Sequence, residues 1–217
     1  MISGLSTKTS ESGTVDILNE NFLSPSLDPR LVWTNPPPDW SIGPEGLRLR
    51  TAAGTDFWQG THYGFRVDNG HVLALPVAGD FVIETAVRGS PLHQYDQAGL
   101  MMRLSPTSWI KTSVEFETAE HSRLGAVVTN AGWSDWSTQD IATRPGAAIG
   151  FRIRRTGADY IVEASPDGED RWLQLRIARL HADDGRGPIL AGLYACSPKA
   201  AGFEASFAHL RVGLGRS

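Results

Sequence analysis

Short stretches of alternating hydrophobic and polar residues recur along most of the chain, and Gly, Pro, Asp and Asn separate them. The clearest stretch covers residues 110–117, IKTSVEFE, in which the two kinds of side chain alternate. A period of two residues is typical of a β-strand that packs one face on a core. The other stretches that predict strands are 47–50, 81–87, 98–104, 149–154, 160–164, 192–196 and 203–207.

Residues 172–180 fit two different periods. Leu173, Leu175 and Ile177 alternate as in a strand, whereas Leu173, Ile177 and Leu180 would share one face of a helix. We predict a strand, because the stretch begins soon after the turn Pro-Asp-Gly at residues 166–168.

The spacing of turns favours an all-β sandwich or barrel. Gly accounts for 23 residues and Pro for 13, which leaves few stretches long enough for a helix. Many short strands with frequent turns are typical of these two architectures. No repeat or linker-like segment divides the chain, so we expect one domain over residues 1–217, with about the first ten residues loosely held.

The charge balance and the hydrophobic runs exclude several kinds of partner. Twenty Lys and Arg against 24 Asp and Glu leave a formal charge of -4, and the basic residues form no block. Nucleic acid is therefore not an expected partner. No run approaches the roughly 18 residues of a membrane span, so no membrane partner is expected either. The N-terminal segment MISGLSTKTSESGTVDIL lacks the hydrophobic region of a secretion signal, and we expect a cytoplasmic protein.

The cysteine and histidine content gives no sign of a metal or cofactor site. Cys196 is the single cysteine, which excludes an internal disulfide and a four-cysteine zinc module. The six histidines have no known metal-ligand spacing, and no phosphate-binding glycine loop or nucleophile elbow occurs. We therefore expect no cofactor and assign no metal. The segment 68–70, Asp-Asn-Gly, is typical of a hairpin turn, although its oxygens would also suit Ca²⁺.

Charged and aromatic side chains share one face of the strand predicted around residues 109–117. The alternate positions on this face are Trp109, Lys111, Ser113, Glu115 and Glu117. The face has two interpretations. It is either a solvent-exposed sheet surface with cross-strand charge pairs, or a binding groove with an aromatic platform and charged hydrogen-bonding groups.

Three further segments bring aromatic residues next to polar ones. Residues 56–58 are Asp-Phe-Trp with His62 shortly after them, 95–97 are Tyr-Asp-Gln, and 133–137 are Trp-Ser-Asp-Trp-Ser. A single Trp is most often a core residue, but indole rings beside carboxylates and amides also suit a sugar, whose C–H faces stack on rings. The candidate ligand-binding residues are Asp56, Trp58, His62, Gln97, Trp109, Lys111, Glu115, Asp135 and Trp136.

Hydrolysis of a polysaccharide is an alternative to plain binding. Glycosidases use two carboxyl groups, about 5–5.5 Å apart in retaining enzymes and about 6.5–9.5 Å apart in inverting ones. Glu115 and Glu117 lie two residues apart on one predicted strand, so their Cα atoms are about 6.6 Å apart. In this alternative Glu115 is the nucleophile or base, and Glu117 or Asp135 is its partner.

Four motifs follow one another along the chain. They are Asp56-Phe57-Trp58 with His62-Tyr63-Gly64-Phe65, Tyr95-Asp96-Gln97-Ala98-Gly99-Leu100-Met101, Trp109-Ile110-Lys111-Thr112 with Glu115-Phe116, and Ser134-Asp135-Trp136-Ser137. In this order they resemble the domain-of-unknown-function family 1349, also called the regulation-of-enolase-like family, over about residues 31–212. The resemblance implies the concanavalin A-like lectin/glucanase fold, a two-sheet antiparallel jelly roll, and by analogy with lectins a saccharide ligand.

The resemblance does not extend to the catalytic signature of the glucanases with this fold, Glu-x-Asp-x-(x)-Glu. Residues 115–120 read EFETAE, with Glu where the signature has Asp. Our leading hypothesis is therefore a noncatalytic carbohydrate-binding protein with its ligand in the concave face of the sandwich. A glycoside hydrolase or lyase is one alternative, and a regulatory module that binds a protein partner in carbon metabolism is another.

Overall fold

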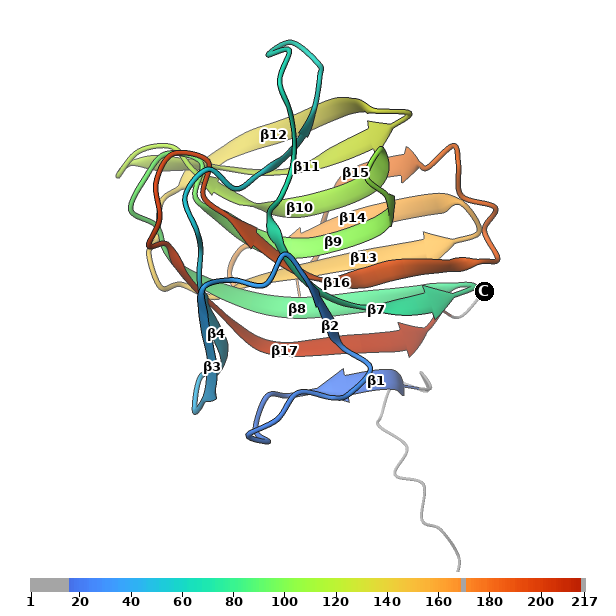
Figure 1. Cartoon of the computed structure of the whole chain (residues 1–217), viewed down its shortest axis with the longest axis horizontal. Helices are drawn as coiled ribbons and strands as arrows, with labels where there is room; N and C mark the ends of the chain where they lie inside the picture. The colour runs from blue at the N-terminus through green and yellow to red at the C-terminus, as the bar shows by residue number, and fades with distance from the viewer. Residues whose placement is uncertain (1–15, 169–170, 216–217) are drawn as a thin grey trace, which may run out of the picture.

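The chain folds into two large antiparallel β-sheets that pack face to face (Figure 1). The computed structural model describes residues 16–168 and 171–215. The expected loose segment at the N-terminus lies outside the described residues. None of the described segments forms a helix that could span a bilayer.

Sheet A has eight strands, in the order β15-β14-β13-β8-β17-β4-β3, and β1 also pairs with β17. Its strands are β1 (Asp16–Glu20), β3 (Asp39–Gly43), β4 (Gly46–Arg50), β8 (Phe81–Ser90), β13 (Ile149–Thr156), β14 (Asp159–Ser165), β15 (Leu173–Arg179) and β17 (Glu204–Leu214). Sheet B has seven strands, in the order β12-β11-β10-β9-β16-β7-β2. Its strands are β2 (Val32–Thr34), β7 (His71–Ala78), β9 (Gln97–Ser105), β10 (Ser108–Phe116), β11 (His121–Asn130), β12 (Trp133–Ala142) and β16 (Pro188–Cys196).

One hydrophobic core fills the space between the sheets. Sheet A contributes Phe81, Phe151 and Phe207 to it, and sheet B contributes Leu100 and Ile110. Each of these side chains is at most 1% exposed, and burial of each stabilises the fold by about 1.5–3 kcal/mol. The all-β, two-sheet antiparallel jelly roll predicted from the sequence is therefore confirmed.

Sheet B is also covered on part of its outer face. A hairpin of β5 (Phe57–Gln59) and β6 (Arg66–Asp68) lies across it and projects beyond the sheets at the top of Figure 1. The Phe57 ring packs against Trp109 and Tyr194, at centroid distances of 6.0 and 6.3 Å. Sheet B thus buries hydrophobic residues on both faces, which explains why β7 is hydrophobic almost throughout and does not alternate.

All the predicted strands are confirmed, including a strand, β15, at residues 172–180. The expected alternation of Leu173, Leu175 and Ile177 is wrong for Ile177. A bulge leaves Leu175 without a partner on β14, and beyond it Ile177 pairs with Ile161 and is 63% exposed. The extra residue shifts the alternation, and Ile177 therefore points away from the core.

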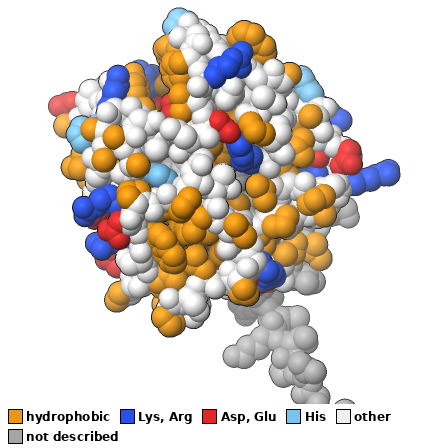
Figure 2. All heavy atoms as spheres, in the orientation of Figure 1, with side chains coloured by type: hydrophobic (Ala, Val, Ile, Leu, Met, Phe, Trp, Pro, Cys, Tyr) orange, Lys and Arg blue, Asp and Glu red, His pale blue; other side chains and the backbone are white. Residues whose placement is uncertain are grey.

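Hydrophobic side chains gather on the lower part of the face shown in Figure 2, where Figure 1 draws β2 and β3. Val32 on β2 is 63% exposed and Trp40 on β3 is 40% exposed. The Trp33 and Trp40 rings lie 5.9 Å apart between centroids. Two of the seven Trp residues, Trp33 and Trp40, therefore pack against each other at this edge of the sandwich.

Candidate ligand-binding site

A cavity of about 240 Å³ opens on the outer face of sheet B, beside the β5–β6 hairpin. Strands β9, β10 and β12 and the hairpin supply most of its side chains. The lining residues are Asp56, Trp58, Tyr63, Phe65, Tyr95, Gln97, Lys111, Glu115, Trp136 and Lys199. Six of the nine predicted ligand-binding residues are among them, namely Asp56, Trp58, Gln97, Lys111, Glu115 and Trp136.

The register of sheet B explains why these side chains meet. Lys111 and Glu115 occupy alternate positions of β10 and so project to the same face. Glu115 pairs with Gln97 on β9, while Lys111 pairs with Val127 on β11, which in turn pairs with Trp136 on β12. Residues directly opposite each other project to the same side of a sheet. Two rows across sheet B, separated by the row of Ser113, therefore supply the polar floor and the indole of Trp136.

Lys111 is the centre of a buried hydrogen-bond network. Its ammonium donates to Asp56 Oδ1 at 3.2 Å and to Gln97 Oε1 at 2.9 Å, and the Tyr194 hydroxyl donates to the same Gln97 oxygen at 3.0 Å. The Lys111 side chain is only 3% exposed. Burial by itself lowers the pKa of Lys111, but the negative charges around it, above all that of Asp56, hold this pKa above its usual value. The ammonium is therefore charged at neutral pH, and Asp56 balances it.

Glu115 lies in the same cavity without a partner. The residue is 9% exposed, and its carboxyl group makes no hydrogen bond or ion pair with any described residue. Burial raises the pKa of Glu115, Lys111 and Arg123 lower it, and Asp56 and Glu117 raise it; together they place this pKa at about 7. Near neutral pH the Glu115 carboxyl is thus free either to donate a hydrogen bond or to accept several.

Aromatic rings form the walls of the cavity. The rings of Trp58 and Tyr63 meet edge to face at 5.4 Å, and those of Tyr63 and Phe65 stack at 5.9 Å. Trp58 Nε1 donates to the carbonyl of Thr61 at 3.0 Å, which holds the indole in place. Tyr63 and Phe65 are 55% and 44% exposed. The polar floor therefore lies below a rim of rings that solvent can reach.

Several hydrogen bonds tie the hairpin that carries Trp58 to sheet B, including one from Arg66 on β6 to the carbonyl of Gly132 at 2.5 Å. The Gln59 amide donates to Ser134 Oγ on β12 at 2.9 Å. Arg103 on β9 forms a bidentate ion pair with Asp68, with distances of 2.5 and 2.7 Å. These contacts fix the hairpin over the sheet and so define one wall of the cavity.

Trp109 lies on the predicted face of β10 but does not line the cavity. The ring of Phe57 on the hairpin covers it, and Trp109 Nε1 donates to the carbonyl of Pro106 at 3.2 Å. With 0% of its surface exposed, Trp109 has no face to offer a ligand. The sequence pattern could not show this, because the covering hairpin comes from a distant part of the chain.

His62 and Asp135 line a neighbouring groove of about 800 Å³. This groove shares Trp58 and Trp136 with the cavity. Asp135 and Trp136 are successive residues of β12, so their side chains project to opposite faces. Asp135 faces β15, where Arg176 pairs with it at 2.9 Å. The structure therefore does not bring His62 and Asp135 into the cavity that holds Glu115.

Glu117 follows the end of β10 and also lies outside the cavity. Its carboxylate accepts hydrogen bonds from Arg123 Nε and from Gln94 Nε2, both at 2.8 Å. Neither Glu117 nor Asp135, the two partners considered for Glu115, thus shares its cavity. Among the described residues that line the cavity, Asp56 is the other carboxylate.

Four lining residues were absent from the candidates drawn from the sequence. Tyr63, Phe65 and Tyr95 occur inside the motifs noted above, so a signal existed for them. Lys199 had none: its loop follows β16, and only the pairing of β16 with β9 brings it to the cavity. Lys199 Nζ lies 5.4 Å from the centroid of the Tyr95 ring.

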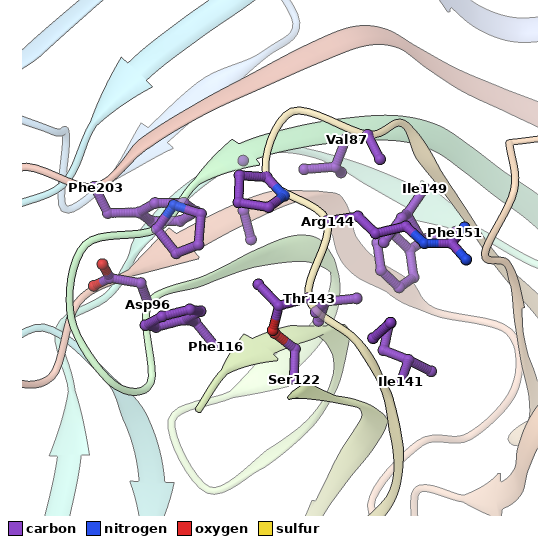
Figure 3. Close-up of a pocket in the computed structure, with 17 residues that line it drawn as sticks. Val87, Asp96, Phe116, Ser122, Ile141, Thr143, Arg144, Ile149, Phe151 and Phe203 are labelled. Carbon is purple, nitrogen blue, oxygen red and sulfur yellow. The ribbon is translucent and has the colours of Figure 1, made fainter. Parts of the chain in front are cut away.

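A smaller space of about 70 Å³ lies between the two sheets. Figure 3 shows mostly hydrophobic side chains around it, including Val87, Phe151 and Phe203. Asp96 beside it accepts a hydrogen bond from the His93 amide at 2.8 Å and another from Ser197 Oγ at 2.6 Å. Because its carboxylate is already bonded within the protein, we attribute this space to packing and not to ligand binding.

The described residues include no group of three or more His, Cys, Asp or Glu placed to hold a metal ion. In the turn at residues 68–70, Asp68 pairs with Arg103, and Asn69 Oδ1 accepts the Asp56 amide at 2.9 Å. The oxygens of this turn therefore hold the hairpin.

Two antiparallel sheets packed face to face define a jelly-roll β-sandwich, and a cavity on an outer face gives it a candidate ligand-binding site. Residues 33–214 match the family described as "Protein of unknown function (DUF1349)", and the chain belongs to this family. It is 33% identical over 189 residues to "Regulation of enolase protein 1" of Saccharomyces cerevisiae, a match that covers 86% of this chain and 91% of that protein.

Solved structures with the same fold agree with this assignment. A functionally unknown protein from Saccharomyces cerevisiae superposes with a TM-score of 0.77 at 29% identity, covering 87% of this chain and 98% of that one. The GH43 protein BlXynB from Bacillus licheniformis superposes with a TM-score of 0.68 at 16% identity. That match covers 97% of this chain but 41% of the GH43 protein, and at this identity it shows the fold alone.

Proposed function

We propose that the protein binds a saccharide, without chemical turnover, in the cavity on the outer face of sheet B. The observation that carries this proposal is a fixed polar floor, built on Lys111 and Glu115, beneath walls made of Trp58 and Trp136. Aromatic faces stack on the C–H faces of sugar rings, and charged groups form the strongest hydrogen bonds to hydroxyls.

Counting donors and acceptors shows what the floor still offers a ligand. Lys111 uses two of its three N–H donors, and Gln97 Nε2 uses one of two, on the carbonyl of Tyr95 at 3.1 Å. Both oxygens of Glu115 are free. Donors and acceptors held side by side match a sugar, whose hydroxyls both donate and accept. Because the network is already formed, binding requires little further ordering of side chains.

Titration of a panel of mono- and oligosaccharides, followed by calorimetry and Trp fluorescence, tests the proposal. Trp136→Ala should weaken binding by about tenfold, because a stacked aromatic contact contributes about 0.5–1.5 kcal/mol beyond the area that it buries. Trp133→Ala is the matched control: Trp133 lies on the same strand, is 60% exposed and does not line the cavity. The absence of any saccharide response at about millimolar concentration would overturn the proposal.

A glycoside hydrolase or lyase remains a second candidate, and the raised pKa of Glu115 favours it, because a general acid works best with a pKa near the operating pH. Asp56 would have to act as the second carboxylate. Release of reducing ends from a polysaccharide panel, abolished in Glu115→Gln, would support hydrolysis. Unchanged polysaccharides after prolonged incubation would leave binding as the function.

The name of the yeast relative supports a role in regulation, for which a protein partner would be needed. The exposed rings of Tyr63 and Phe65 at the tip of the hairpin favour this candidate, because aromatic residues often dominate the energetics of protein interfaces. Affinity capture with the double variant Tyr63→Ser/Phe65→Ser as control tests it. A stoichiometric partner that the variant loses, with no saccharide response of the protein, would favour regulation over sugar binding.

A further inference from the structure

The charges at the floor of the cavity are not balanced. Lys111 and Asp56 form an ion pair at 3.2 Å and neutralise each other. Glu115 is more than nine-tenths buried, opens into the cavity and has no ion pair with any described residue. Buried charges are normally paired, and an unpaired carboxylate is costly. When Glu115 is ionised, the floor is therefore short of one positive charge.

Among the described residues, no side chain forms an ion pair with Glu115. The titratable groups that interact with its charge or line the cavity are Asp56, Tyr63, Tyr95, Lys111, Glu117, Arg123, Tyr194, Cys196 and Lys199. Arg123 pairs with Glu117 at 2.8 Å and with Asp140 at 3.5 Å. Lys199 lines the cavity, but its ammonium lies over the Tyr95 ring and makes no ion pair within the described residues.

The walls of the cavity also suit a cation. The face of an aromatic ring attracts an ammonium group, most strongly when the site is shielded from water. Trp58, Tyr63, Phe65 and Trp136 line the same cavity as Glu115, and Arg123 lies over the Trp136 ring at 6.0 Å. One ring of this cavity already has an ammonium group over its face, because Lys199 Nζ lies 5.4 Å from the centroid of the Tyr95 ring.

We propose that the ligand carries an ammonium group that pairs with Glu115 between the aromatic walls, so that the cavity prefers amino sugars to neutral sugars. This inference rests on the proposed saccharide function and narrows it to one ligand class. The hydroxyls of such a sugar bind the remaining donors of Lys111 and Gln97, and its ammonium supplies the missing charge.

Calorimetric titration with four compounds tests the inference: glucose, N-acetylglucosamine, 6-amino-6-deoxyglucose and methylammonium. At about pH 8 a primary alkylamine is protonated and Glu115 is largely ionised. The amino sugar should then bind at least about tenfold more tightly than glucose, because hydrogen bonds to charged groups are worth about 1.5–3 kcal/mol. The preference should vanish near pH 6, where Glu115 takes up a proton while the amine keeps its charge.

Glu115→Gln keeps the shape of the side chain and should abolish the preference for the amino sugar, so that the ratio of its affinity to that of glucose falls to about one. Glu117→Gln changes a carboxylate just past the end of β10 and outside the cavity, and this variant should retain the preference. Melting curves of both variants verify folding.

Different results overturn different statements. Equal affinity for glucose and the amino sugar would overturn the ammonium inference and leave saccharide binding in place. Binding of methylammonium but of no sugar would overturn saccharide binding and retain a site for simple ammonium ions. Absence of binding by all four compounds would overturn both.

Discussion

Lys111 and Glu115 show how two buried charges on the same face of one strand come to differ. Lys111 is held by Asp56 and Gln97, and its charge is balanced. Glu115 has no such partner, so burial outweighs the opposing charge of Lys111 and raises its pKa. The alternation of β10 places both residues, but their partners decide their charge states.

The pH dependence of stability should reveal the isolation of Glu115. Its pKa is about 7 in the folded protein against an ordinary value of 4.5. Below about pH 4.5 both states are protonated, and no penalty arises. As the pH rises towards 7, Glu115 ionises in the unfolded chain while it stays protonated in the folded protein. The free energy of unfolding therefore falls, by up to about 3 kcal/mol.

Glu115→Gln cannot ionise, so its stability relative to the unchanged protein should rise by up to about 3 kcal/mol between about pH 4 and pH 8. Urea unfolding of both proteins across this pH range measures the difference in their free energies of unfolding. The contributions of the other titrating groups are common to both proteins and cancel in this difference. A difference that does not vary with pH would show that the folded protein does not raise the pKa of Glu115.

At the scale of elements, the β11–β12 hairpin and the β5–β6 hairpin build the cavity together. Ala131 and Gly132 both have positive φ, 49° and 77°, as in a two-residue type I′ turn. This turn sets Trp133 opposite Asn130 and thereby sends Trp136 to the outer face. The predicted site grouped Asp135 with Trp136, but adjacent residues of one strand cannot share a face.

Ser134→Ala should loosen the β5–β6 hairpin. Ser134 Oγ accepts a hydrogen bond from the Gln59 amide at 2.9 Å. Removing this hydroxyl leaves a buried N–H without a partner, which costs about 1–3 kcal/mol of stability. We expect faster hydrogen exchange of the hairpin amides, by about tenfold or more, and weaker saccharide binding through Trp58. Ser137→Ala, on the same strand, is the control and should change neither. Unchanged exchange in Ser134→Ala would show that other contacts hold the hairpin.

At the scale of the whole molecule, a buried ion pair ties sheet A to distant loops. Arg155 on β13 binds Asp183 through two bonds of 2.5 and 3.0 Å and also donates to the carbonyl of Gly79 at 2.8 Å. The Tyr160 hydroxyl donates to Asp183 as well. Burial alone raises the pKa of Asp183, but these donors outweigh it and hold this pKa below its usual value.

Asp183→Asn should therefore destabilise the protein by about 3–5 kcal/mol at neutral pH, because it leaves the buried Arg155 without its counter-charge. The neighbouring Asp184→Asn is the control: Asp184 accepts only amides of its own turn, at 2.7 and 2.8 Å, and its loss should cost about 1 kcal/mol. Urea unfolding at neutral pH measures both. If both variants lose the same free energy of unfolding, the ion pair of Arg155 with Asp183 stabilises the protein no more than the turn contacts of Asp184 do.

The sequence by itself determined the class of fold and the faces of individual strands. Alternation is a local property, since each peptide unit turns the next side chain to the opposite side. For this reason residues 110–117 sufficed to place Lys111 and Glu115 on one face and Ile110 on the other. The motifs around Trp58, Gln97 and Trp136 likewise contained seven of the residues that line the cavity.

The tertiary structure alone decided which of those residues meet. The β5–β6 hairpin covers Trp109 but leaves Glu115 open, and the pairing of β16 with β9 brings Lys199 to the rim. Such contacts join segments far apart in the chain, and their free energy depends on the packing of the whole sandwich. A local pattern carries no information on that packing. It therefore could not tell a buried indole from a stacking platform, nor a paired carboxylate from a free one.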